Sequence, residues 1–205
     1  KTLSYRSNTT SSTPFYLTDI QLGASLNTNS FFNGSIDQVR LFSKSLNQTE
    51  VDTLYAETAC VYECTTDTVN YPSGTTPVAY YILDNSSEDY STGGNDGSDT
   101  NVEYRFGRFG QAAVFNGSSS KIQLPTSTFS PSTFSLSAWC NVTSDTDENT
   151  ILELFDNQTY PNNTTIVLSA GSTGYSSRFL LRNYTTNQYN YNPSGTVSKN
   201  VWKHY

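Results

Sequence analysis

Short apolar or alternating runs recur along this chain of 205 residues, and they constrain its fold more than any other feature of the sequence. The runs are rich in Val, Ile, Phe and Tyr, which fit a pleated, half-buried sheet. They lie at residues 35–42, 78–83, 111–115, 121–124, 134–139, 150–155, 165–169 and 178–183. Gly, Asn, Ser and Pro separate them about every 8–12 residues, a spacing typical of a β-sandwich or barrel. The sequence therefore predicts an all-β fold.

One segment departs from this pattern and predicts a short helix. Asn47, followed three residues later by Glu50, is a variant of the capping box, in which two residues satisfy each other's backbone amides. Apolar residues then follow at helical spacing on one face, namely Val51, Leu54 and Tyr55. We expect a helix of about two turns near residues 48–57.

Charge and composition exclude several classes of function. Lys and Arg total 11, are scattered along the chain and leave a net charge of −7, so the basic stripe of a nucleic-acid-binding protein is missing. No run approaches the roughly 18 apolar residues of a membrane-spanning helix. Only 14% of the residues are charged, against about 25% in an ordinary domain, so the surface is solvated mainly by uncharged Asn, Ser and Thr. We expect an extracellular protein or one on the surface of a virion, without nucleic-acid binding or membrane insertion.

Residues 58–77 interrupt the strand pattern. They hold several Thr together with the turn formers Pro72, Gly74 and Pro77, and this composition indicates a linker. The chain therefore divides into residues 1–57 and residues 78–205.

The three cysteines point to structure and not to chemistry. Cys60 and Cys64 frame the sequence Cys-Val-Tyr-Glu-Cys and form either a small local disulfide or two free thiols. Cys140 lies in an apolar run and is expected to be a buried thiol. Three Cys and one His offer no recognisable zinc-ligand spacing.

Residues 32–55 resemble the closing segment of laminin-G-like modules, which belong to the concanavalin-like superfamily. That segment has the form Phe-x-Gly-x-Ile-Asp-x-Val-Arg, followed by Leu-x-x-x-Glu and Leu-Tyr, and every one of these positions is filled here.

Residues 78–205 resemble the beginning of such a module. Residues 78–84 look like its first strand, and residues 106–122 match its Gly-x-Phe-Gly-x-Ala-x-x-Phe-Asn-Gly segment. Residues 134–139 and 201–205 are similar to two later strands that each carry a Trp.

The resemblance implies a concanavalin-like antiparallel β-sandwich, also called a jelly roll. The order along this chain is end, linker, beginning, which implies a window from a tandem array. Residues 1–57 would be the C-terminal part of one module, residues 58–77 a linker, and residues 78–205 the N-terminal part of a second module. Residues 1–57 are then expected to complete the beginning of a second module that is supplied by a neighbouring chain, or by a copy of this one.

No catalytic residue is predicted. The concanavalin-like fold also houses glycoside hydrolases, which need two carboxylates about 5–9 Å apart. The best candidates are Glu153 and Asp156, but a spacing of three places their side chains on opposite faces of a strand. His204, the one histidine, is expected to be a strand residue beside Trp202 and not a member of a Ser-His-Asp site.

The resemblance also implies a possible calcium site, because related lectin-like modules often hold a structural calcium ion, which prefers clustered oxygen ligands. The loop after the first strand offers Asp84, Asp89, Asp96 and Asp99. A second acidic loop carries Asp145, Asp147 and Glu148. The alternative interpretation is that these are solvated turn residues, and no other cofactor is predicted.

Tyrosines in an Asn-rich stretch are candidate glycan-binding residues. Lectin faces use exposed aromatic rings that stack on sugars, and the candidates here are Tyr175, Tyr184, Tyr189 and Tyr191. The alternative is that these amphipathic rings cover the solvent edge of a sheet.

Two functional hypotheses follow. The first is a non-enzymatic surface protein for structure or adhesion, such as a virion fibre, a virion decoration or an extracellular appendage, whose partners include neighbouring copies or other structural subunits. Tandem modules of this composition are similar to those in structural proteins of marine bacterial viruses. The second is a carbohydrate-binding lectin module of a larger secreted protein, with glycans or a host cell-surface polysaccharide as its partner.

Overall fold

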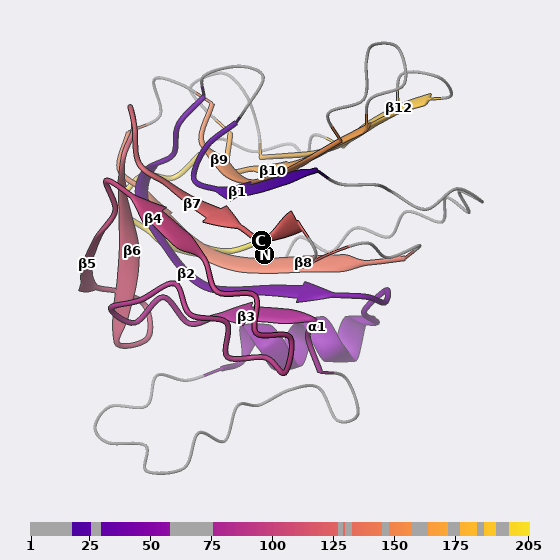
Figure 1. Ribbon diagram of the computed structural model, residues 1–205, viewed down its shortest axis with the longest axis horizontal. Helices are drawn as coiled ribbons and strands as arrows, with labels where there is room; N and C mark the ends of the chain where they lie inside the picture. Colours follow the sequence, from indigo (N-terminus) through magenta and orange to yellow (C-terminus); the bar gives the residue numbers. More distant parts are fainter. Residues whose placement is uncertain are drawn as a thin grey trace.

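Two antiparallel sheets lie face to face in the computed structural model of the chain (Figure 1). The structure describes residues 18–25, 30–57, 76–126, 129, 133–144, 148–156, 164–171, 177–183, 187–191 and 197–205. The predicted antiparallel β-sandwich is confirmed.

The seven-stranded sheet has the strand order β12–β11–β10–β9–β1–β7–β4. Its strands are β1 (Asp19–Leu22), β4 (Ser98–Thr100), β7 (Lys121–Leu124), β9 (Thr150–Phe155), β10 (Thr164–Ser169), β11 (Arg178–Asn183) and β12 (Asn187–Tyr191).

The six-stranded sheet has the strand order β13–β8–β2–β6–β5, and β3 pairs with β2 beside this path. Its strands are β2 (Asn33–Phe42), β3 (Ala79–Tyr81), β5 (Glu103–Phe106), β6 (Gln111–Asn116), β8 (Ser135–Val142) and β13 (Trp202–His204).

Strand alternation fills the space between the sheets with apolar side chains. In β1, Ile20 and Leu22 are fully buried in the core, whereas Gln21 between them faces away from it. The facing sheet contributes buried residues from β2, β6 and β8, among them Ile36, Leu41, Ala113, Phe115 and Cys140. The expectation that Cys140 is a buried thiol is therefore confirmed.

The N-terminal segment and the rest of the chain share both sheets. β1 lies between β9 and β7, and β2 lies between β8 and β6. In the structure the two segments therefore contribute to one sandwich, and the division of the chain into two partial modules of a tandem array stays a prediction. The physical reason is that β1 and β2 need partner edges on both sides, and strands within residues 76–205 present those edges. Residues 58–75, most of the expected linker, lie outside the described residues.

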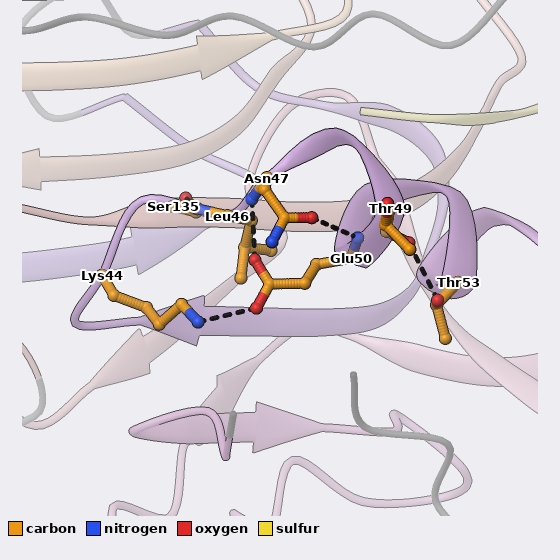
Figure 2. A network of polar contacts seen from close by, with 7 residues as sticks. All are labelled: Lys44, Leu46, Asn47, Thr49, Glu50, Thr53 and Ser135. Atoms are coloured by element: carbon orange, nitrogen blue, oxygen red, sulfur yellow. Dashed lines mark hydrogen bonds and ion pairs between the residues drawn. The ribbon is translucent and has the colours of Figure 1, made fainter. Parts of the chain in front are cut away.

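Helix α1 (Gln48–Tyr55) lies against the outer face of the six-stranded sheet (Figure 1). The predicted capping box is present, because Asn47 Oδ1 accepts from the Glu50 amide at 3.0 Å and Glu50 Oε2 accepts from the Asn47 amide at 2.7 Å (Figure 2). Lys44 Nζ contacts the second oxygen of Glu50 at 2.6 Å. The helix ends two residues before the expected position, since Ala56 forms its C-cap.

The start of the helix is tied to the other segment. The amide of Leu46 donates to Ser135 Oγ on β8 at 2.9 Å (Figure 2). Leu54 is buried together with Leu46 and Phe42, and Val51 packs against them. The helix thus seals the outer face of β2 and β8.

Two glycines allow the N-terminal segment to approach its neighbours closely. Gly34 has φ +147°, and a Cβ there would lie 2.1 Å from the Asn141 carbonyl oxygen. Gly23 has φ +76°, and a Cβ there would lie 2.1 Å from the ring of Phe115. Both positions therefore exclude a side chain for steric reasons and because of their backbone conformation.

Candidate functional site

A row of polar side chains crosses four neighbouring strands on the outer face of the seven-stranded sheet. The strand register places Glu153 opposite Gln21, Gln21 opposite Gln123, and Gln123 opposite Ser98. Asp19 precedes Gln21 by two residues and shares its face. We call Asp19, Gln21, Ser98, Gln123 and Glu153 the polar row.

Hydrogen bonds join three members of the polar row. Gln21 Nε2 donates to Gln123 Oε1 at 2.9 Å, and Gln123 Nε2 donates to Asp19 Oδ1 at 2.6 Å. Gln123 Nε2 also lies 3.1 Å from the carbonyl oxygen of Ile20. Because an amide group donates only from nitrogen and accepts only at oxygen, this chain of bonds fixes the orientation of both glutamines.

Exposure increases along the polar row from β9 towards β4. Glu153 and Gln21 are 1% and 3% exposed, Gln123 is half-buried, and Ser98 is exposed. The accessible end of the row therefore lies on β7 and β4, where an amide and a hydroxyl stand side by side.

The sequence alone does not predict the polar row, although Glu153, one of its members, is among the candidate carboxylates of the sequence analysis. Glu153 was considered together with Asp156 as a carboxylate pair; the structure places Glu153 in the polar row and Asp156 after the last residue of β9. Gln21 and Gln123 are 102 residues apart in the sequence. Polar residues alternating with Ile and Leu in both 19–22 and 121–124 are a sequence signal for an outer polar face, but only the register joins the two strands.

A second polar cluster lies on the outer face of the six-stranded sheet, where the two chain segments meet. We call it the buried joint, and it consists of Asp37, Arg40, Glu57, Tyr80, Ser137, Trp139 and His204, together with Arg108, whose side chain is exposed. The register places Asp37 opposite Trp139, Trp139 opposite His204, and Arg40 between Ser137 and Tyr80.

Asp37 fastens β2 to the loop before β6. Its Oδ2 accepts from the backbone amides of Arg108 and Phe109, both at 2.9 Å. Ile36, Val39 and Leu41 do not alternate strictly in the sequence, which predicts a bulge near Asp37. A register shift between Asp37 and Arg40, with Gln38 at φ 52°, confirms this bulge. Burial raises the pKa of Asp37 from 3.8 to about 7, although the two amides act in the opposite direction.

Arg40 is the most deeply buried cation of the joint. Its Nη2 donates to Gln38 Oε1 and Tyr80 Oη, both at 3.0 Å, and its guanidinium lies 4.3 Å from the centre of the Tyr80 ring. The same Nη2 lies 3.0 Å from Glu57 Oε1, a distance that makes an ion pair without the angles of a hydrogen bond. Burial raises the pKa of Glu57, and the charge of Arg40 acts against this rise.

Trp139 and His204 stand side by side beneath α1. The Tyr55 ring stacks on Trp139 with centroids 5.6 Å apart, and the Arg108 guanidinium lies 4.7 Å from the Trp139 ring centre. His204 Nε2 lies 2.7 Å from Ser137 Oγ. Its Nδ1 has no hydrogen-bond partner among the described residues, whereas a Ser-His-Asp site needs a carboxylate there. The contacts of His204 are thus those of a buried strand residue.

Two titratable residues of the buried joint predict how the stability of the protein depends on pH. The raised pKa of Asp37 means that its contribution to stability is complete below about pH 4 and is lost as pH rises through about 7. Burial, followed by the charge of Arg40, lowers the pKa of His204 from 6.5 to about 4, so its contribution is present above pH 6.5 and is lost as pH falls towards 4. The two contributions therefore oppose each other between pH 4 and 6.5.

Substitution separates these contributions. Relative to the unmodified protein, Asp37→Asn is expected to gain stability as pH rises from 4 to 7, and His204→Gln is expected to lose it. Urea unfolding at several pH values measures both differences. Profiles parallel to that of the unmodified protein would contradict the two pKa shifts.

The four predicted calcium ligands serve separate hydrogen bonds. Asp84 Oδ1 accepts from the Gln111 amide at 3.0 Å, and Asp96 Oδ1 accepts from the Asp89 amide at 2.9 Å. Asp99 Oδ2 accepts from the Tyr104 hydroxyl at 2.6 Å.

Asp89 organises the loop that follows β3. Its two oxygens accept from the amides of Tyr80, Ser91 and Asn95, each at 2.9 Å. Burial alone would raise the pKa of Asp89, but these amides outweigh it and lower the pKa. Among the described residues no three His, Cys, Asp or Glu side chains gather to hold a metal ion. Each of the four carboxylates thus already accepts a hydrogen bond within the chain, and the calcium site stays a prediction.

Only some of the other predicted site residues lie within the part of the chain that the structure describes. Tyr175, Tyr184, Cys60 and Cys64, together with Asp145 and Asp147, lie outside the described residues. In β12, Tyr189 pairs with Leu181 and Tyr191 pairs with Phe179. The same two residues of β11 pair on their other side with Ile166 and Leu168 of β10. Nothing in this pairing tests glycan binding by the two tyrosines, which stays a prediction.

Comparison with known families finds a match for one part of this chain. Residues 116–205 match the family model of the concanavalin A-like lectin/glucanases superfamily, in its laminin G group. No curated protein and no solved structure matches the chain. The chain has a concanavalin-like fold, and this match covers its strands from β7 to β13.

The concanavalin-like sandwich is completed by strands that the family match does not include. β1 and β2 lie outside residues 116–205, yet each occupies an interior position in its sheet. The described residues contain no helix long and apolar enough to cross a membrane. A lectin-like or adhesion module is the general role that such a fold indicates.

Proposed function

We propose that this chain is a non-enzymatic adhesion module of an extracellular or particle-surface protein, such as a fibre, a decoration or an appendage, and that it binds glycans at the polar row. Its partners are glycans or a cell-surface polysaccharide. The uncharged polar composition and the concanavalin-like fold support this proposal.

The polar row is the observation that carries the proposal. Sugar hydroxyls both donate and accept hydrogen bonds. Planar amides offer both functions in fixed directions, and carboxylates accept. Gln123 is held in place from two sides, by Gln21 and by Asp19. Such pre-orientation lowers the entropy lost when a ligand is bound.

Glycan binding is tested with the full chain on a glycan array, followed by calorimetric titration of the best-binding oligosaccharide. Gln123→Ala is expected to weaken binding by about tenfold or more. A tenfold change in affinity corresponds to ~1.4 kcal/mol of binding free energy, which is about what the loss of one hydrogen-bonding side chain costs. The matched control is Gln48→Ala, which removes an exposed amide on α1, distant from the polar row, and should leave affinity unchanged. A folded protein that binds no glycan, or binds equally well without Gln123, would contradict the proposal.

The alternative is a lectin module of a larger secreted protein, and the same polar row favours it equally. The two differ in assembly. An adhesion fibre or decoration forms ordered assemblies with neighbouring subunits, whereas a lectin module binds the same glycans as an isolated unit. Electron microscopy of the native particle or secreted protein distinguishes them.

A further inference from the structure

The N-terminal segment of described residues, 18–57, makes almost no sheet contacts within itself. β1 pairs only with β7 and β9, and β2 pairs only with β3, β6 and β8, all of which belong to residues 76–205. The one pairing inside the segment is an isolated bridge between Ala24 and Phe31. The segment therefore depends on the rest of the sandwich for its strand structure.

The remaining strands have two matching slots. Without β1, the edges of β9 and β7 are unpaired and the seven-stranded sheet is divided. Without β2, the same is true of β8 and β6 in the six-stranded sheet. An unpaired strand edge is a template for another strand, and these two slots fit the sequence of this segment.

Several specific contacts select the segment and its register. Asp37 accepts from the amides of Arg108 and Phe109, and Arg40 contacts Tyr80. Gly34 lies against the backbone of Asn141, where no other residue type fits. Such contacts are identical whether the segment comes from the same chain or from another copy.

One connection joins the segment to the rest of the chain, and it is residues 58–75. These 18 residues reach up to about 60 Å when extended. Exchange of an identical element between copies keeps all contacts outside the connection, which is why it is a low-cost route to assembly.

We infer that residues 18–57 of one copy complete the sandwich of a second copy of this chain. In the exchanged assembly, Asp19 and Gln21 come from one copy while Gln123 and Glu153 come from the other, so each polar row is built from two chains. Reciprocal exchange gives a closed dimer, and exchange in one direction gives a linear array. This inference stands apart from glycan binding, because strand pairing alone carries it.

A cysteine pair across the two segments tests the exchange in the full chain. Ser35 lies opposite Val114 in the pairing of β2 with β6. Ser35→Cys with Val114→Cys, in a background of Cys60→Ser, Cys64→Ser and Cys140→Ala, links the segment to whichever copy it completes. Oxidation after refolding at rising protein concentration is followed by denaturing electrophoresis without reductant.

Covalent dimers or longer ladders that increase with concentration and disappear on reduction are expected. The matched control, Glu103→Cys with Val114→Cys, links β5 to β6 within one segment and should give monomers under all conditions. Complete disulfide formation with monomers alone, at every concentration, would overturn the inference. Light scattering of the unmodified chain gives a second readout independent of folding in the variants, and a monomer at all concentrations would overturn it as well.

Discussion

Arg40→Ala is expected to lower the free energy of unfolding by about 3–5 kcal/mol, the usual cost of removing one partner of a buried ion pair. Arg40 is 2% exposed and contacts Gln38, Tyr80 and Glu57. Its loss leaves the Glu57 carboxyl without its neutralising charge. It also removes one of the two donors to Gln38 Oε1, the other being the Tyr80 hydroxyl. Urea or thermal unfolding measures the change.

Two further variants show whether charge is the cause. Arg105→Ala is the matched control, because Arg105 forms an exposed pair with Glu103 and such pairs contribute at most about 1 kcal/mol. Combining Arg40→Ala with Glu57→Gln should recover part of the lost stability, since the unpaired carboxylate is then removed. Equal effects of Arg40→Ala and Arg105→Ala would show that the joint contributes no more than a surface pair.

Phe115→Ala is expected to cost about 3–5 kcal/mol through the cavity it leaves in the core. The ring is 1% exposed and lies edge-on to Phe32 with centroids 6.0 Å apart. It also covers Gly23 at the end of β1. The substitution therefore weakens contacts between both chain segments, and calorimetry should show a midpoint lower by about 6–20 °C.

Phe106→Ala is the control for Phe115→Ala. Phe106 ends β5 and is 98% exposed, so its removal should change stability by about 0.5 kcal/mol or less. Comparable destabilisation by the two substitutions would mean that the core position of Phe115 is not as described.

Local patterns in the sequence predicted the elements whose causes are local. The capping box of Asn47 and Glu50 predicted α1, and the alternation broken near Asp37 predicted both β2 and its bulge. β3 is shorter than the run at residues 78–83, because Leu83 adopts φ 58° and leaves the strand conformation. β4, β5 and β12 were not predicted because they contain no Val, Ile or Leu. β1 was missed although its four residues alternate as those of β7 do.

Features that depend on pairing between distant strands could not be predicted in the same way. The polar row needs the register of β1 against β7, and the buried joint needs β2 beside β8 and β13. The motif residues Asp37 and Arg40 were visible, but their partners Arg108 and Tyr80 were not. The order of the two segments predicted separate modules. The pairing of strands from one segment with strands from the other has no local signature in the sequence, so it could not be predicted.

The interior positions of β1 and β2 set the timing of folding during synthesis. Ile20 pairs with Leu124 on one side and Leu154 on the other, so its strand has no complete environment until the chain has grown past both. At about 5–20 residues per second, translation takes on the order of ten seconds to cover that distance. Such long-range pairing also makes the folding step itself slow.

During that interval the apolar side chains of β1 and β2 remain in water. A nascent chain with this topology is thus exposed to premature association through these apolar segments. Slower translation lengthens the period in which β1 and β2 have been synthesised but the strands that pair with them have not.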